Sequence, residues 1–442
     1  MELPELFILR TKSLLGDAYP DFEQALQVTS PVSVRVNNKL RTYMPSDQKV
    51  PWCKAGYYLD QRPLFTADPL LHAGVYYVQE ASSMFLQHVV EEFFGEVETV
   101  LDLCAAPGGK STLISEALHD DALLVSNELV RSRAMILAEN VIKWGNPNVV
   151  VTNNQPDAFK QLPAFFDAVV VDAPCSGEGM FRKNPDSIGE WSLQNVIQCA
   201  IRQKNILQEV WDTLKPGGIL VYSTCTYNRE ENEDNVAWIC ENLGAVRLKI
   251  DLKDLHGVVE SDFGYRFYPH RIEGEGFFIS VMRKDVDFSN HPKYKQEKGM
   301  SGINRSQDFI AKIRNAHDYA IIETDQFITA YPLNQLSRMM TLKKKLNCVV
   351  NGVFLAELKG KDVIPAHQFA LSKILDTAGV NQFELDYKTA IAFLKRENIY
   401  LPDAPLGYVL VTFQQQALGW VKNLGKRCNN LYPQYWRIRM FL

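Results

Sequence analysis

The chain has 442 residues, of which 46% are hydrophobic and 22% are charged, so it has the composition of a globular protein with two or three domains. Eight cysteines without a C-x-x-C pair argue against a disulfide or zinc scaffold, and no apolar run reaches the roughly 18 residues of a membrane helix. With a net charge of −5, the molecule as a whole does not attract a polyanion. We therefore expect a cytoplasmic monomer without metal, signal peptide or membrane segment.

Residues 1–75 combine a helical start with the alternating segment SVRVNN, residues 33–38, which predicts a short strand. From about 97 to 285, β and α patterns alternate, and five short apolar segments predict buried strands: 97–104, 122–129, 148–153, 166–173 and 218–225. Segments of helical length lie between most of them, such as 193–214, which the sequence KPGG then breaks. This alternation predicts a doubly wound, Rossmann-like α/β domain over residues 76–285. Its last segment, RFYPHRIEGEGFFISVMRK, predicts an antiparallel hairpin at the sheet edge.

Residues 286–305 are polar and without periodicity, and we interpret them as a linker to a C-terminal region, 306–442. This region contains the basic run Lys343–Lys345 and ends in short β-like segments. Beyond Asp403 its charged residues are all basic, and they alternate with aromatic residues, a combination suited to phosphates and exposed bases. The alternative is a solvated face on a small β domain.

The segment VLDLCAAPGGKST follows the first of these strands and opens a helix, a place where glycines allow close approach of a ligand. It resembles a P-loop, but Cys104 stands where that loop needs glycine and Pro107 lacks the N–H that a phosphate cradle uses. A nucleoside site fits better, because Glu128 follows Gly109 at the distance of an acidic residue that binds ribose hydroxyls. We expect S-adenosylmethionine as the ligand; a purely structural glycine turn is the remaining alternative.

Two cysteines and an aspartate follow the fourth and fifth strands. Asp172 and Cys175 end one, and Cys225 ends the other, so all three lie at one cavity if these strands are neighbours, roughly 5 Å apart. A thiolate that adds to carbon 6 of a pyrimidine makes carbon 5 nucleophilic enough to take a methyl group, after which a base removes the carbon-5 proton. Asp172 is placed to support the adduct near ring nitrogen 3, and the second thiol to serve as base or to aid release. A buried cysteine is otherwise a small hydrophobe, as we expect for Cys104.

These residues resemble the Nol/Nop/Sun family of RNA cytosine-C5 methyltransferases. The resemblance rests on DLCAAPGGKS, VDAPCSGEGMFRK, GGILVYSTCTYNREENE and RFYPHRIEGEGFF, and the tail from Gly407 is similar to the PUA-like ending of its bacterial RsmF-like branch. The resemblance implies Cys225 as nucleophile, Cys175 in adduct release, and 16S ribosomal RNA or the small subunit as partner. Alternatives are transfer RNA as substrate, a P-loop NTPase, and a non-catalytic RNA-binding assembly factor.

The cofactor site implied by the resemblance comprises Cys104, Ala105, Ala106, Pro107, Gly108, Gly109, Lys110, Glu128, Arg133, Asp157 and Asp172. Basic residues near the cavity mouth, in the N-terminal strand and in the tail are the expected RNA contacts: Arg35, Arg182, Lys183, Lys422, Lys426 and Arg427.

Overall fold

The computed structural model describes residues 2–40, 43–253, 255–285 and 307–440. The linker predicted at 286–305 lies outside the described residues. No helix in the part of the chain that the structure describes is long and apolar enough to cross a membrane.

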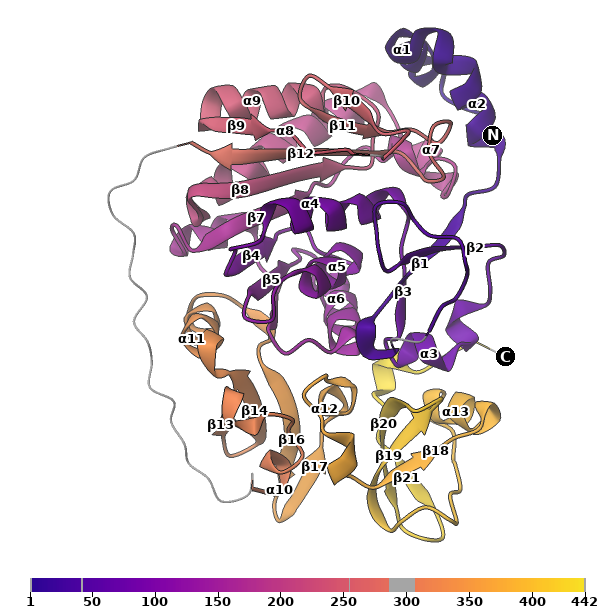
Figure 1. The fold of residues 1–442 in the computed structure, drawn as a ribbon, viewed down its shortest axis with the longest axis vertical. Coiled ribbons are helices and arrows are strands. Elements are labelled where there is room, and N and C mark those ends of the chain that lie inside the picture. Colours follow the sequence, from indigo (N-terminus) through magenta and orange to yellow (C-terminus); the bar gives the residue numbers. More distant parts are fainter. Residues whose placement is uncertain (1, 41–42, 254, 286–306, 441–442) are drawn as a thin grey trace.

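A large mixed sheet forms the centre of the molecule (Figure 1). Its strand order in the described residues is β10-β11-β12-β8-β7-β4-β5-β6-β15, with β9 paired to β12. The five predicted strands are all present and mutually parallel: β4 Thr99–Asp102, β5 Leu123–Asn127, β6 Val149–Thr152, β7 Phe166–Asp172 and β8 Leu214–Thr224. The fourth and fifth of them, β7 and β8, are neighbours, which is the condition for Cys175 and Cys225 to lie at one cavity.

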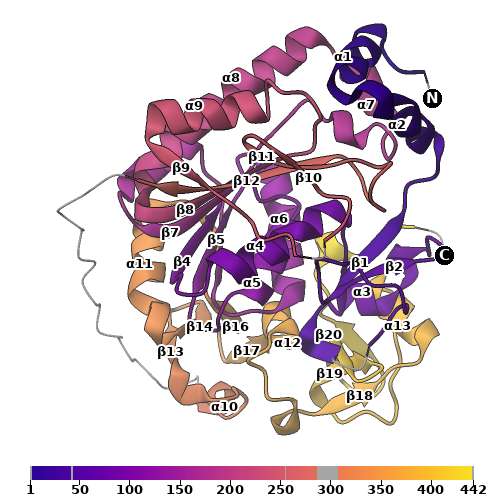
Figure 2. The same cartoon turned by 45° about the horizontal axis from the view of Figure 1, so that its top comes forward.

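Helices cover both faces of this sheet, which confirms the doubly wound fold. On one face lie α4 Leu86–Phe93, α5 Gly109–Ala117 and α6 Arg131–Trp144. On the other lie α8 Leu193–Val210, α9 Glu233–Leu243 and α11 Leu336–Lys345 (Figure 2). The strands are apolar along their length because both of their faces are buried against these helices.

The predicted edge hairpin is present as β11 Gly264–Phe267 and β12 Phe277–Lys284, which pair antiparallel, with β10 Val259–Ser261 and β9 Ala245–Leu248 beside them. One prediction for this part of the sheet was wrong: the sequence KPGG is not a break between helix α8 and strand β8, because it lies within β8. β8 already begins at Leu214 and accommodates these residues through a register shift against β7.

The N-terminal segment forms two helices and a small sheet. Helices α1 Glu5–Leu15 and α2 Tyr19–Gln27 pack on the loops that follow β7 and β8, where the Phe7 ring lies 5.1 Å from Phe181 and the Phe22 ring 5.1 Å from Tyr227. The predicted SVRVNN strand is β1 Val32–Val36, between β2 Gly56–Leu59 and β3 Tyr76–Val78. Short helices α3 Pro69–His72 and α7 Asp186–Glu190 complete the part before the C-terminal region.

The C-terminal region forms two four-stranded sheets, as far as its described residues extend. The first contains β13 Tyr319–Glu323, β14 Phe327–Pro332, β16 Val353–Lys359 and β17 Asp362–Pro365, and the second β18 Gln382–Glu384, β19 Gly407–Phe413, β20 Gln416–Asn423 and β21 Cys428–Asn430. The helices here are α10 Gln307–Ile310, α12 His367–Leu371 and α13 Tyr387–Leu394. The region also extends the central sheet, because β15 Cys348–Val350 pairs antiparallel with β6, which the sequence did not predict.

Candidate active site

Strand order fixes where a ligand can approach the central sheet. Among the parallel strands the chain passes outward from β4 to β6 and then returns to β7 on the other side of β4, so the topological switch point lies between β4 and β7. In open α/β sheets the ligand crevice lies beyond the carboxyl ends of the strands at this point. The loops after β4 and β7 therefore define the candidate site, and β8 adds the next strand end.

The loop after β4 has the backbone that close ligand approach requires. Gly108 has φ +118° and precedes α5, and a Cβ on it would meet the side chains of Leu137 and Asn140 at 3.3 Å. The helix begins at Gly109, so its first N–H groups face the loop and favour negatively polarised ligand atoms. The glycines predicted from VLDLCAAPGGKST thus lie at the switch point.

Glu128 lies beside this loop at the end of β5. It is buried, and its Oε1 accepts a hydrogen bond from the N–H of Val130 at 2.8 Å. Arg133 Nη1 lies 3.5 Å from Glu128 Oε2, while Arg133 Nη2 donates to the carbonyl of Ala106 at 2.9 Å. Arg133 thus joins Glu128 to the glycine loop, so the predicted cofactor residues Glu128 and Arg133 form one bonded group with that loop.

Lys110 and Asp172 connect the cofactor loop to the end of β7. Lys110 Nζ lies 2.7 Å from Asp172 Oδ2, and Ser223 Oγ donates to Asp172 Oδ1 at 2.8 Å. Burial lowers the pKa of Lys110, but the charge of Asp172, the hydrogen bond to Asp172 and other acidic groups nearby together leave the pKa above its ordinary value. Lys110 is therefore a cation that holds the Asp172 carboxylate in place.

Sequence reasoning missed Asp102, the last residue of β4. It is fully buried, and although Ser111 Oγ donates to its Oδ2 at 2.6 Å, Oδ1 has no hydrogen-bond partner among the described residues. Burial raises the pKa of Asp102 to about 7. The available signal was a carboxylate inside the otherwise apolar strand segment VLDLC, because a buried aspartate without a cation is expensive unless it serves a ligand.

Cys104 lies among these carboxylates. Burial raises its pKa, and the charges of Asp102, Asp172 and Glu128 raise it further, so the group stays a thiol. Its side chain packs against the core between the sheet and α8, as expected for a residue that packs rather than reacts.

The residues present fit S-adenosylmethionine. Three carboxylates, Asp102, Glu128 and Asp172, surround the glycine loop and match a ligand with a sulfonium cation and ribose hydroxyls. The partnerless Asp102 Oδ1 is a buried polar atom beside this loop that the described residues leave unused.

Next to this loop the structure brings the two predicted cysteines together. Cys175 Sγ and Cys225 Sγ lie 3.0 Å apart, and the N–H of Cys225 donates to Cys175 Sγ at 3.4 Å. Both side chains are half-buried, whereas most residues around them are buried. The hydrogen bond with Cys225, followed by burial, raises the pKa of Cys175 well above its ordinary value, so Cys175 is a neutral thiol at neutral pH.

The segment after Cys225 is a turn and not the start of a helix. The spacing of Asn228 and Glu231 is that of a helix-capping box. They do bond to each other, through the Glu231 N–H at 2.9 Å and Asn228 Nδ2 at 2.7 Å, but they form a turn, and α9 begins only at Glu233. Helix α9 therefore begins too far along the chain for its first turn to include Cys225. The helix dipole acts mainly within that first turn.

Two residues expected to contact RNA are instead part of the interior. Arg35 is 1% exposed, its Nε donates to Gln79 at 2.9 Å, its Nη2 donates to Thr112 at 2.6 Å, and its guanidinium lies 4.3 Å from the Trp144 ring. The prediction was wrong because β1 lies inside the molecule: its residues from Ser33 to Val36 are all buried, Arg35 among them.

Arg182 is the second of these residues, with a side chain only 6% exposed. Its guanidinium forms an ion pair with Glu275 at 3.1 Å and donates to the carbonyls of Ala25 and Gly274. It therefore joins the loop after Cys175 to the N-terminal helices, and RNA cannot reach the guanidinium in this arrangement.

The other predicted contacts lie at the surface. Lys183 is exposed beside the loop of Cys175, and Lys426 and Arg427 are exposed between β20 and β21. Lys422 is half-buried, with Nζ 5.2 Å from the centre of the Tyr408 ring. The predicted cofactor residue Asp157 is also exposed, in the short 3-10 helix η5 (Pro156–Gln161) that follows β6.

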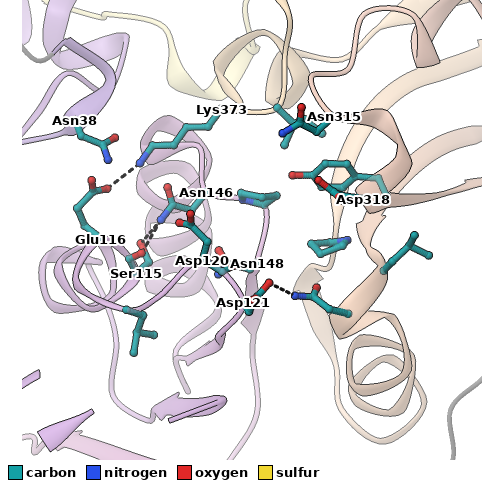
Figure 3. A pocket seen from close by; sticks show the side chains of 17 residues that line it. Asn38, Ser115, Glu116, Asp120, Asp121, Asn146, Asn148, Asn315, Asp318 and Lys373 are labelled. Carbon is teal, nitrogen blue, oxygen red and sulfur yellow. Dashed lines mark hydrogen bonds and ion pairs between the residues drawn. The ribbon is translucent and has the colours of Figure 1, made fainter. Parts of the chain in front are cut away.

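The opposite, amino edge of the sheet contains a cavity of about 520 Å³ (Figure 3). It lies between the α/β domain and the C-terminal region, where Lys373 Nζ pairs with Glu116 at 2.8 Å across the cavity wall. Its acidic lining, Glu116, Asp120, Asp121 and Asp318, disfavours a phosphate backbone, and the thiols lie at the other edge. A metal-binding group of three or more His, Cys, Asp or Glu side chains was not found within the described ranges.

Comparison with known proteins gives the same domain order. Family models match residues 3–81 (N-terminal domain of 16S rRNA methyltransferase RsmF), 94–283 (16S rRNA methyltransferase RsmB/F) and 380–438 (methyltransferase RsmF PUA domain). The ribosomal RNA small subunit methyltransferase F of Citrobacter koseri is 31% identical over 98% of this chain and 96% of its own length, and that of an Escherichia coli strain matches equally well.

A solved structure, that of a methyltransferase homologue from Pyrococcus horikoshii, superposes with a TM-score of 0.55 at 28% identity. It covers 64% of this chain and 95% of that chain. The matches span the fold, the glycine loop and the thiol loops together. The chain belongs to the RsmF family of ribosomal RNA methyltransferases, enzymes that take their methyl group from S-adenosylmethionine.

Proposed function

We propose that this protein methylates carbon 5 of cytosine in 16S ribosomal RNA, with Cys225 as the covalent nucleophile. The observation that carries the proposal is the pair of sulfurs 3.0 Å apart beside the switch point of the sheet. A methyltransferase acting on a ring nitrogen or a hydroxyl has no use for a thiol at this position, whereas carbon 5 of a pyrimidine is too weak a nucleophile without one.

In the proposed reaction the Cys225 thiolate adds to carbon 6 of the ring and forms an S–C bond, which places electron density on carbon 5. S-adenosylmethionine supplies the electrophilic methyl group that carbon 5 accepts. A base then takes the carbon-5 proton, the S–C bond breaks as the ring double bond re-forms, and the Cys225 sulfur leaves. Each step is easier than direct methylation of the unactivated ring.

Cys175 is proposed to assist the release. Its raised pKa makes it a neutral thiol in the resting site, so it can give a proton to the departing Cys225 sulfur 3.0 Å away. In the same step Cys175 Sγ takes up the proton from carbon 5, because the S–C bond can break only as that proton leaves, so both cysteines end as thiols. This assignment accounts for the protonation state of Cys175 without an additional base.

Asp172 is proposed to stabilise the adduct at ring nitrogen 3: this nitrogen becomes basic as sulfur adds to carbon 6 and takes up a proton from water, and the Asp172 carboxylate accepts a hydrogen bond from the resulting N–H. Its carboxylate is bonded to Lys110 and Ser223 on the side of the cofactor loop, so its position is fixed before the base enters. The target cytosine must be unpaired or flipped into the site, at a cost of a few kcal/mol.

The substrate assignment to 16S RNA rests on the relatives, and the PUA domain match favours RNA contacts in the C-terminal region. We propose a cytoplasmic monomer in which Lys183 lies beside the target base and Lys426 and Arg427 contact the RNA further away. Bisulfite mapping of total RNA from cells with and without the gene checks the substrate: a lost 5-methylcytosine in 16S RNA supports the assignment, and a loss in transfer RNA replaces it.

Trapping of the covalent intermediate tests the chemistry. Cys175→Ala, incubated with 16S RNA and S-adenosylmethionine, should accumulate a protein–RNA adduct that survives a denaturing gel, because methyl transfer proceeds while release is blocked. Cys225→Ala should give no adduct and no methylation. If Cys225→Ala accumulated the adduct instead, the two roles would be exchanged; if neither variant did, covalent catalysis would be rejected.

A further inference from the structure

The pairing of β7 with β8 ends before either cysteine. The last registered pair is Asp172 with Ser223, followed by one hydrogen bond from the N–H of Ala173 to the carbonyl of Ser223. Contacts between the two loops therefore set the distance between the sulfurs. This makes the loop contacts, and not the strands, responsible for the geometry of the nucleophile.

Glu178 makes the most extensive of these contacts. It lies in the loop of Cys175, is 2% exposed, and its Oε1 accepts a hydrogen bond from Trp191 Nε1 at 3.0 Å. Its Oε2 accepts from the three residues that follow Cys225: from Thr226 Oγ1 at 2.7 Å and from the N–H groups of Tyr227 and Asn228 at 2.9 Å each. The next residue reinforces this junction, because the N–H of Gly179 donates to the carbonyl of Cys225 at 2.9 Å.

The chemistry of these contacts requires a carboxylate. Both oxygens of Glu178 act only as acceptors, and the groups around them are N–H and O–H donors. Glutamine has nearly the same shape, but its NH₂ end would face donors on one side, and it would leave buried N–H groups unpaired. A side chain of the same shape but without two acceptor oxygens therefore does not replace Glu178.

We propose that Glu178 is a positioning residue for the nucleophile: through the backbone of residues 226–228 it holds Cys225 where its sulfur can reach carbon 6 of the base. Glu178 itself touches neither RNA nor cofactor. A displacement of about 1 Å in a reacting group can cost on the order of 10²-fold in rate, so loss of this contact acts on the rate of addition. The inference rests on the proposed function and assigns a further residue to the same reaction.

The test measures adduct formation directly. The full chain is mixed with S-adenosylmethionine and 16S RNA transcribed with 5-fluorocytidine, in which fluorine replaces the carbon-5 proton, so the methylated adduct cannot be resolved and persists on a denaturing gel. Glu178→Gln should form the adduct at least about tenfold more slowly than wild type, with the Kd values for S-adenosylmethionine and RNA unchanged.

Glu116→Gln is the matched control. Glu116 Oε2 accepts a hydrogen bond from Trp144 Nε1 at 3.1 Å and pairs with Lys373 Nζ at 2.8 Å, at the amino edge of the sheet and away from the thiol loops. Its replacement weakens a partly buried ion pair, so the Tm should fall. The rate of adduct formation should nevertheless stay within a factor of about two of wild type.

Thr226→Val gives an independent reading if Glu178→Gln does not fold. It removes one donor to Glu178, together with the contacts of Thr226 Oγ1 with Ser176 and Asn228, and keeps the carboxylate, so it should slow adduct formation in the same direction by a smaller factor. The inference is overturned if the folded variants at 178 or 226 form the adduct at the wild-type rate, or if Glu116→Gln slows it equally. An absence of adduct in the wild type, by contrast, would contradict the proposed function itself.

Discussion

The two edges of the central sheet differ in what they offer a ligand. The amino edge has the acidic cavity of about 520 Å³, lined by residues of the α/β domain and the C-terminal region. The carboxyl edge has half-buried thiols, the Lys110–Asp172 pair and a carboxylate, Asp102, with one oxygen unpartnered among the described residues. A cavity of about 500 Å³ also lies beside the loops of the carboxyl edge, lined in part by Glu178, Tyr227 and Asn228, so the two edges differ in their reactive groups and not in volume.

This difference shows that strand direction, and not the size of a hollow, locates the chemistry in this fold. At the carboxyl edge the chain leaves each strand through a loop, and the loops after β4, β7 and β8 converge at the switch point. At the amino edge the same strands begin, and their polar residues bond mainly to neighbouring backbone: Asn148 Nδ2, for example, donates to the carbonyl of Asp120 at 3.2 Å. Variants at the two edges should therefore behave differently.

The largest effect is expected at the nucleophile. Cys225→Ser should lower methyl transfer by about 10³-fold or more, because a hydroxyl at neutral pH adds poorly to carbon 6. Cys240→Ser, at a half-buried cysteine of α9 that packs against the core, is the control and should retain the wild-type rate. Single-turnover transfer of a labelled methyl group measures both, and equal rates for the two variants would contradict the comparison.

A smaller loss is expected from the charge at the end of β7. Asp172→Asn removes the anion that holds Lys110 and should lower the rate by about 10²-fold. Asp120→Asn, in the acidic cavity of the amino edge, should leave the rate unchanged. The same methyl-transfer assay decides, and a comparable loss in Asp120→Asn would show that the cavity contributes to catalysis.

The pH dependence of stability should report on Asp102. Its pKa is raised in the folded state to about 7, so between about pH 4 and pH 7 the folded chain holds a proton that the unfolded chain releases. This favours the folded state most at low pH, and the contribution is lost as the pH rises toward 7. Asp102→Asn should remove that decline, by up to a few kcal/mol, in urea unfolding of the cofactor-free protein at pH 5 to 8. Parallel stability curves for variant and wild type would contradict the assignment.

The smallest effect separates exposed from buried basic residues. Arg427→Ala should reduce the slope of log affinity for RNA against log salt concentration by about one unit, because it removes one phosphate contact. Arg35→Met should leave that slope unchanged, because Arg35 is buried. It should instead lower the free energy of unfolding by about 3 kcal/mol, since it removes the buried hydrogen bonds that the guanidinium donates. Filter binding at several salt concentrations, together with urea unfolding, distinguishes the two.

The sequence predicts the parts of this molecule that depend on local pattern. Apolar runs gave the five parallel strands, and residues at their ends gave the thiol pair, because parallel strands bring their carboxyl ends to the same edge. The hairpin at the edge was also predicted, from its glycine-rich turn. The roles assigned to Cys175, Cys225 and Asp172 remain predictions until they are tested.

What the sequence does not predict depends on long-range packing. Strand β15 joins β6 from almost 200 residues further along the chain, and nothing in the short segment around Cys348 indicates its partner. Arg35 and Arg182 look like surface cations, but the guanidinium bonds that bury them reach Thr112 and Glu275, which are distant in the sequence. The unpartnered Oδ1 of Asp102 cannot be predicted from the sequence, because the lack of a hydrogen-bond donor depends on where all the neighbouring side chains lie.

The central claim is that Cys225 bonds to the target base. Its most direct test is mass spectrometry of the adduct trapped with Cys175→Ala, after digestion of the RNA and the protein. We predict a methylated cytidine nucleotide attached to the peptide that contains Cys225. A nucleotide on any other peptide, or methylated RNA without a trapped peptide, would contradict the account.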